Sequence, residues 1–209
     1  MASKYAIEHI DHNMDFIAPC VEGKYDIPFI RPEPYVKCKY FPFGNKNAQY
    51  KRREHGLHFF VYDYRFSVLW TTRSKYQNML PEFRAVLAPD FSLYYDSPIM
   101  VQMWNHYRKH LLAAWMQSIG CRVYPVIRWG DKRSWDFCFD GEPYNATVCV
   151  SSKGMLREKE EKRIFLEGYD KMLEVLAPET IMFYGSIPKE CKGNIIPVDE
   201  FTRRFKELE

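Results

Sequence analysis

The 209 residues include 30 Lys and Arg against 27 Asp and Glu, and 46% of the chain is hydrophobic. A chain of this length and composition can bury a real core, which excludes a disordered or collagen-like protein. The formal charge of +3 is too small by itself to indicate a polyanionic partner. No apolar run approaches the roughly 20 residues of a membrane span, so no membrane partner is expected.

The predicted elements alternate from Gly56 onward. Residues 1–50 contain five prolines and little periodicity, so we expect an irregular N-terminal segment packed on residues 51–209 within one α/β domain, 1–209. Short apolar runs then alternate with helical patterns, which is typical of βαβ units and a mostly parallel sheet. The predicted strands are 57–62, 85–88, 122–128, 146–150, 180–184 and 194–198, and the predicted helices are 66–69, 75–83, 98–119, 158–176 and 199–209. About six units predict an incomplete TIM-like barrel or an open sheet, because a full barrel needs about 250 residues.

The two longest predicted helices have recognisable faces. In the first, Trp104 belongs to an apolar stripe, and Arg108 lies close to that stripe, where its guanidinium would need a partner or a polar pocket. His106 and His110, an i, i+4 pair that could chelate a metal, lie roughly opposite, so a solvated face is expected for them. In the second, Gly168 lies on the packing stripe, which predicts a close approach of helix to sheet.

The carboxyl ends of parallel strands converge on one edge of a sheet, so the residues after each strand are the candidates for a site. Asp63, Asp90 and Asp140 each follow an apolar or aromatic run and are the candidate catalytic residues. A low dielectric there could perturb their pKa values, or the carboxylates could hold a divalent cation. The candidate ligand-binding residues are Arg108 of the long helix and seven residues at the strand ends: Ser92, Tyr94, Trp129, Ser151, Ser152, Gly154 and Tyr184.

Among these residues, two groups suggest what a ligand would contain. The hydroxyls and glycine at 151–154 precede a helix start, a setting that suits phosphate, and Trp129 offers a flat ring for a base or sugar. The chain has no G-x-S-x-G, H-E-x-x-H or Walker lysine motif. An enzyme built on these residues would be a carboxylate- or metal-dependent hydrolase.

The segment 31–53 concentrates positive charge, with seven Lys and Arg against Glu33 alone. Aromatic residues interleave with these cations, and that combination suits single-stranded nucleic acid. The alternative interpretation is a solvated edge whose aromatic rings face inward. The candidate nucleic-acid contacts are Lys37, Lys39, Lys46, Lys51, Arg52 and Arg53.

The six cysteines form no C-x-x-C pair, and the charged start has no signal-peptide pattern, so a reducing, cytoplasmic compartment is expected. Several segments in order resemble a known family: LHFFVYDYRF, APDFSLYYDSP, WNHYR, FDGEP, VSSKG and MFYGS, between about Pro28 and Val198. They are similar to a domain-of-unknown-function family encoded by bacteriophages, prophages and other mobile elements. The resemblance implies a phage-related protein acting inside a bacterial host cell, and no catalytic residue is carried over from the family.

Three functions follow from these observations. The first is a carboxylate-lined pocket at the strand ends that binds, and could hydrolyse, a phosphorylated or nucleotide-like ligand. The second is a nucleic-acid-binding module that uses the segment 31–53. The third is a non-catalytic inhibitor that grips a host defence protein through an aromatic surface.

Overall fold

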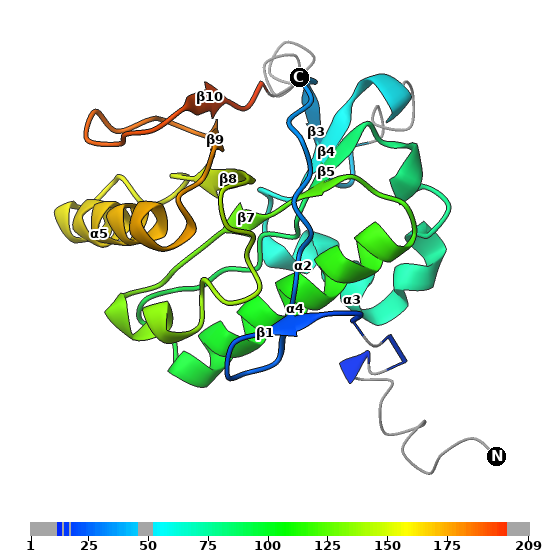
Figure 1. Cartoon of the computed structure of the whole chain (residues 1–209), viewed down its shortest axis with the longest axis horizontal. Helices are drawn as coiled ribbons and strands as arrows, with labels where there is room; N and C mark the ends of the chain where they lie inside the picture. Colours follow the sequence, from blue (N-terminus) through cyan, green and yellow to red (C-terminus); the bar gives the residue numbers. More distant parts are fainter. Residues whose placement is uncertain (1–11, 14, 17, 46–51, 200–209) are drawn as a thin grey trace.

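The computed structural model describes residues 12–13, 15–16, 18–45 and 52–199, in which short strands alternate with helices (Figure 1). The strands are β1 Val21–Glu22, β2 Ile27–Pro28, β3 Tyr40–Pro42, β4 Gly56–His58, β5 Ala85–Leu87, β6 Val123–Tyr124, β7 Val126–Ile127, β8 Thr147–Ser151, β9 Thr180–Tyr184 and β10 Ile195–Pro197. The helices are α2 Asp63–Phe66, α3 Val68–Thr72, α4 Ile99–Ser118 and α5 Lys159–Leu176, with 3-10 turns η3 Arg52–Glu54, η4 Arg73–Tyr76, η5 Leu80–Glu82 and η6 Lys132–Asp136.

Two four-stranded sheets form the centre, and all of their strand pairs are parallel, as the alternation predicted. One sheet has the order β3-β4-β5-β6 and the other β10-β9-β8-β7. Pro125, which has no backbone N–H, separates β6 from β7 and interrupts the predicted strand 122–128. Because β6 pairs with β5 and β7 with β8, this single segment belongs to both sheets. The predicted six-unit TIM-like arrangement is not confirmed, because the strands divide between these two sheets and β9 reaches β10 without a helix.

Helix α5 covers the second sheet, at the left of Figure 1. Its apolar face packs with residues of β8 and β9 in one buried cluster, and all the residues of these two strands are buried. The predicted close approach at Gly168 is confirmed: a Cβ there would lie 2.2 Å from Nε1 of Trp129, the second residue after β7. The glycine therefore lets α5 rest directly on the indole.

Helix α4 is buried on two sides rather than one, which contradicts the predicted solvated face. His106 and His110 are fully buried, and so is Lys109 between them. The β1–β2 hairpin and the loop after η6 cover this face, and each imidazole hydrogen-bonds a backbone carbonyl there. Trp104, predicted to face the core, is instead 37% exposed. Helical periodicity identified the two faces but not which neighbours would cover them.

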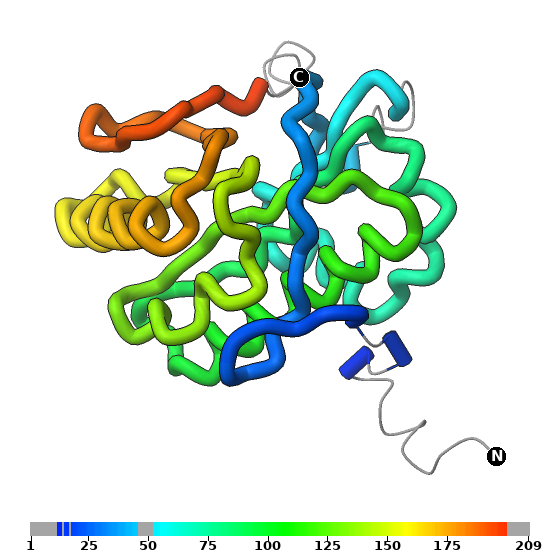
Figure 2. The backbone as a smooth tube through the Cα atoms, in the orientation of Figure 1, coloured from blue at the N-terminus to red at the C-terminus, as the bar shows by residue number. Residues whose placement is uncertain are grey.

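The N-terminal segment is more regular than predicted. Strands β1 and β2 pair antiparallel, and β3 adds to β4 as a parallel edge strand because Tyr40 and Phe41 are buried in the core. Figure 2 shows the chain between β2 and β3, in blue, crossing the molecule. The Tyr40 N–H donates to the carbonyl of Asp199 at 2.9 Å, so the two outer strands approach each other.

Three other predicted helices differ. The predicted helices 66–69 and 75–83 are replaced by α2, α3 and the short turns η4 and η5, with Pro81 inside the last of these. The predicted helix 199–209 lies outside the described residues apart from Asp199. None of the helices in the described ranges is long and apolar enough to cross a membrane.

Candidate functional site

A cavity of about 470 Å³ opens at the carboxyl ends of β4, β5, β7 and β8. This is where parallel strands were expected to gather their polar loops. The lining residues come from the segments that follow these four strands and from the first turn of α5: Phe60, Val61, Tyr62, Asp63, Arg65, Asp90, Ser92, Leu93, Tyr94, Tyr95, Arg128, Trp129, Ser151, Lys153, Gly154, Met155, Arg157 and Glu161. Seven predicted site residues are among them: Asp63, Asp90, Ser92, Tyr94, Trp129, Ser151 and Gly154.

Asp63 connects two of the strand-end loops. Its two carboxylate oxygens accept hydrogen bonds from the backbone N–H and the hydroxyl of Ser92, both at 3.0 Å. Asn105 of α4 donates to the Ser92 carbonyl at 2.7 Å and so helps to hold the same loop in place. Asp63 therefore stabilises the cavity wall, and both of its carboxylate oxygens already accept a hydrogen bond.

Asp90 lies at the floor of the cavity and is only 5% exposed. Its Oδ2 accepts from the Arg128 guanidinium at 2.9 Å, whereas its buried Oδ1 has no hydrogen-bond partner. Burial raises the pKa of Asp90, and the Arg128 charge opposes that rise. The buried position, the unpartnered oxygen and the raised pKa make Asp90 a candidate functional group.

The loop after β8 contributes a cation to the wall. Lys153 donates from Nζ to the Phe60 carbonyl at 3.0 Å and lies over the Tyr184 ring at 5.5 Å. Tyr184 itself stacks on Phe60 and stands behind the wall rather than in it. Ser152 also points elsewhere, because its hydroxyl donates to the Ser186 carbonyl at 2.7 Å. Both residues support the pocket without lining it.

The aromatic residues of the cavity divide into buried and exposed rings. Trp129 lines it but is 4% exposed and packs on Phe165 of α5, so most of its ring belongs to the core. Tyr62 and Tyr94 are 74% and 62% exposed. These tyrosines are therefore the exposed rings that a ligand could stack on, although the Tyr62 ring already stacks on Tyr64 with centroids 5.9 Å apart. Sequence reasoning missed Tyr62.

Arg108 lies beside the cavity rather than in it. Its guanidinium lies over the Phe91 ring at 4.0 Å and donates to the Asn105 side chain. Burial lowers the pKa of Arg108, and the nearby Asp63 charge opposes this. The predicted need for a partner is met within the protein in part, because the buried Nε of Arg108 has no hydrogen-bond partner.

Asp140 is the predicted catalytic residue that the structure places elsewhere. It does not line the cavity, and its side chain lies against the β1–β2 turn, where a Cβ on Gly23 would be 1.9 Å from Asp140 Oδ2. The prediction failed because the chain between β7 and β8 runs through η6 and returns along α4 before it reaches Asp140. The three aspartates therefore do not form one cation site.

The basic segment 31–53 keeps its charge but not its aromatic surface. Tyr40, Phe41 and Phe43 are buried, so these three rings cannot stack on bases. Arg52 pairs with Glu82 and Lys39 with Asp199, and both Lys37 and Arg53 are exposed. The predicted contacts Lys46 and Lys51 lie outside the described residues.

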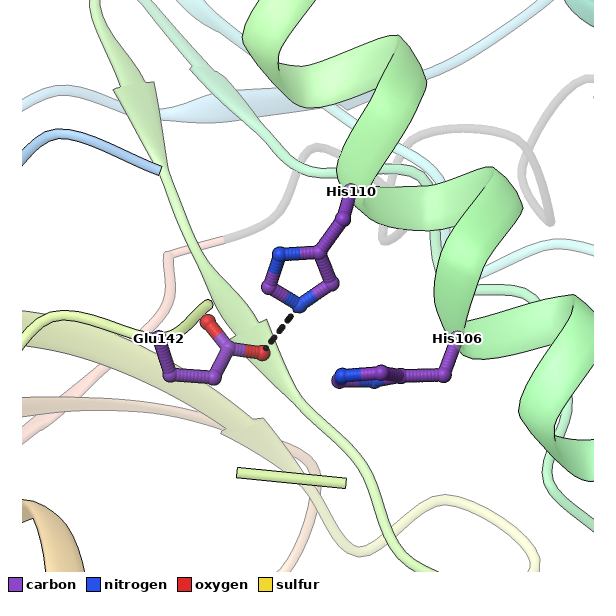
Figure 3. Close-up of side chains that lie close together, drawn as sticks. All are labelled: His106, His110 and Glu142. Atoms are coloured by element: carbon purple, nitrogen blue, oxygen red, sulfur yellow. Dashed lines mark hydrogen bonds and ion pairs between the residues drawn. The ribbon is translucent and has the colours of Figure 1, made fainter. Parts of the chain in front are cut away.

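A second polar group, which sequence reasoning dismissed, lies buried under α4. His106, His110 and Glu142 point toward one another (Figure 3). They form the only trio of possible metal-ligating side chains within 4.8 Å of one another that the described ranges contain. The i, i+4 histidine spacing was visible in the sequence, but no local signal showed that the Phe139–Glu142 loop would return to it.

The comparisons with known proteins agree with the predicted phage-encoded family. Residues 20–202 match the family described as Domain of unknown function (DUF4417). The Gene 1 protein of Mycobacterium phage L5 is 34% identical over 176 residues, 83% of this chain and 76% of that protein. The Gene 1 protein of Mycobacterium phage D29 is 37% identical over 193 residues, 88% of this chain and 70% of that protein. No solved structure matches the chain. Because the family model covers most of its length, this chain belongs to the DUF4417 family.

Proposed function

We propose that the cavity at the strand ends binds a small phosphorylated, nucleotide-like ligand. The observation that carries this proposal is the charge distribution in the cavity, where the buried Asp90 pairs with the half-buried Arg128 and three further cations, Arg65, Lys153 and Arg157, share the lining. The acidic residues in the lining are Asp63, Asp90 and Glu161. The lining is therefore of mixed charge rather than carboxylate-lined, and a ligand with an anionic end fits it.

The phosphate end would be held by side chains. Arg65, Lys153 and Arg157 are exposed at the cavity, and guanidinium groups bind phosphate oxygens through paired hydrogen bonds. The N-terminus of α5 is less suited to this role than its position suggests. Glu158 and Glu161 form a capping box there and already accept from the free backbone N–H groups.

The ring end would stack on the exposed tyrosines at the mouth. Tyr62 and Tyr94 both line the cavity and present most of their surface to solvent. The cavity volume of about 470 Å³ falls within the roughly 300–1,000 Å³ of small-molecule pockets. A nucleotide would lie with its base or sugar against the tyrosines and its phosphate against the cations.

Within this proposal Asp90 is the group placed to exchange a proton. Its free Oδ1 and raised pKa suit a general acid or base, and hydrolysis of the ligand would use it to activate water. A divalent cation at Asp63 and Asp90 receives less support, because Ser92 occupies both oxygens of Asp63 and Arg128 holds one of Asp90.

Isothermal titration calorimetry tests the proposal with five probes: inorganic pyrophosphate and the four ribonucleoside diphosphates. We expect at least one to bind, and Arg65→Ala and Arg157→Ala each to weaken it about tenfold or more, since a hydrogen bond to a charged group contributes about 1.5–3 kcal/mol. Arg53→Ala is the matched control, because Arg53 is an exposed arginine outside the cavity. No binding by any probe, or an equal loss with Arg53→Ala, would overturn the proposal.

The same variants separate the alternatives. Nucleic-acid binding through the segment 31–53 would depend on Lys37 and Arg53 and not on Arg157. Inhibition of a host defence protein, which would use exposed rings such as Tyr62, would give a stoichiometric protein complex and no binding of the five probes. In each case the phage relatives support action inside a bacterial host cell.

A further inference from the structure

The buried trio under α4 is built from two separate parts of the chain. Helix α4 supplies His106 and His110 one turn apart, and the loop before β8 supplies Glu142. The two imidazoles are fully buried, and Glu142 is 4% exposed. The trio does not line the cavity of the proposed function, so it requires an explanation of its own.

Backbone carbonyls fix the orientation of both histidines. Nε2 of His106 lies 3.0 Å from the Asp140 carbonyl, and Nδ1 of His110 lies 2.8 Å from the Pro28 carbonyl. A carbonyl oxygen can only accept, so these two ring nitrogens donate. The opposite nitrogens, Nδ1 of His106 and Nε2 of His110, then carry lone pairs in the neutral rings. Histidines that bind metals are held in this way by a second hydrogen bond.

Two acceptor atoms of the trio lack a donor. Nδ1 of His106 and Oε2 of Glu142 are buried and have no hydrogen-bond partner. Nε2 of His110 faces Oε1 of Glu142 at 3.0 Å, which sets a lone pair against a carboxylate oxygen. Orphaned buried acceptors are costly, so this arrangement is explained best by a positive centre between them.

Gly141 permits the approach of the loop. Its φ is +76°, and a Cβ there would lie 2.8 Å from both His110 Nδ1 and the Pro28 carbonyl. Any larger residue would push the loop, and with it Glu142, away from the histidines. The local backbone is thus shaped around the trio.

We propose that His106, His110 and Glu142 bind one divalent transition-metal ion of the zinc class in a buried site. Two imidazole nitrogens and one carboxylate oxygen are ligands typical of zinc, whereas Mg²⁺ and Ca²⁺ prefer oxygen alone. The ion would join α4 to the Glu142 loop, which are distant in sequence, and His110 already links α4 to β2 through the Pro28 carbonyl.

Lys109 determines how Glu142 would bind the metal. Its ammonium group donates to Oε1 of Glu142 and to the Val126 carbonyl, so it already balances the carboxylate charge. The metal would then bind through the other oxygen of Glu142, Oε2, which has no hydrogen-bond partner. These three side chains would leave the fourth position of a tetrahedral zinc site to a water molecule.

The test uses the full chain, stripped with a chelator and titrated with Zn²⁺ alone. We expect one ion per chain and, at a free concentration of about 100 times Kd, a rise in Tm of roughly 5–10 °C. Co²⁺ in place of Zn²⁺ should give the visible absorption of a four-coordinate site without a thiolate band. A thiolate band would identify a cysteine ligand and overturn the assignment, and so would the absence of both Zn²⁺ binding and the Tm rise.

Two variants keep the structural hydrogen bonds while removing the ligand atoms. His106→Gln retains a donor near the Nε2 position and His110→Asn retains one near the Nδ1 position. Each should weaken Zn²⁺ binding by at least tenfold. The exposed His12→Gln is the control and should bind as the unchanged protein does. Equal binding by all three variants would place the ion elsewhere. If the two ligand variants do not fold, the Zn²⁺ and Co²⁺ measurements on the unchanged chain decide the question.

Discussion

Replacing Gly168 of α5 by alanine tests whether the close approach to Trp129 is necessary. The added Cβ would lie 2.2 Å from Nε1 and 2.3 Å from Cδ1 of the indole. Trp129 is buried against Phe165, with ring centroids 5.5 Å apart, so it cannot move without repacking. Overpacking of this kind costs about 1–3 kcal/mol, and the better helix propensity of alanine returns about 1 kcal/mol. We expect a net loss of up to about 2 kcal/mol and a Tm lower by up to about 8 °C.

A double-mutant cycle isolates the contact. Trp129→Leu removes Nε1 and leaves a flexible side chain that can turn away from the added methyl group. In that background Gly168→Ala should be neutral or stabilising by up to about 1 kcal/mol, because only the propensity gain remains. Urea unfolding of the four chains, followed by circular dichroism, gives the coupling energy, which we expect to be about 1–3 kcal/mol. A coupling below about 0.5 kcal/mol, or a Gly168→Ala chain more stable than the unchanged protein, would refute this reasoning.

Two further substitutions test the pocket floor and the Gly141 loop. Because burial raises the pKa of Asp90 despite Arg128, ionisation costs folded stability as pH rises above its ordinary value of 3.8. Asp90→Asn should therefore raise Tm at pH 7, and the gain should vanish below about pH 3.8; a lower Tm at pH 7 would contradict this. Gly141→Ala and Gly44→Ala both place a Cβ at positive φ, which costs about 1–2 kcal/mol. Only the former also meets the Pro28 carbonyl, so urea unfolding should show a further loss of about 1–3 kcal/mol, and equal losses would argue against the contact.

Much of the candidate pocket could be predicted because it depends on strand direction. Asp63, Asp90 and Ser92 follow a strand within a few residues, Ser151 is the last residue of β8, and parallel strands bring these positions to one edge. The positions of such residues can be predicted without knowing which distant segments contact them. Tyr62 was missed because exposure, rather than strand position, makes it available to a ligand.

The predictions that failed depended on how distant segments cover one another. Asp140 comes after η6, and its position depends on the path of a long connection rather than on the end of a strand. The i, i+4 spacing of His106 and His110 can be read from the sequence. However, the β1–β2 hairpin and the Glu142 loop decide that this face of α4 is buried. The rings of the segment 31–53 are likewise buried because β3 joins the sheet.

By itself, the sequence determined the alternation of strand and helix, the parallel direction of the strands, the edge at which the pocket opens and the close contact at Gly168. These features follow from periodicity and side-chain size, which act over a few residues. Only the tertiary structure decided that Pro125 divides one segment between two sheets and that Asp90 keeps a free, buried oxygen. It also decided that the Glu142 loop packs on α4 and brings its carboxylate close to His106 and His110. These features depend on desolvation and on contacts between segments far apart in the chain, and no local pattern specifies them.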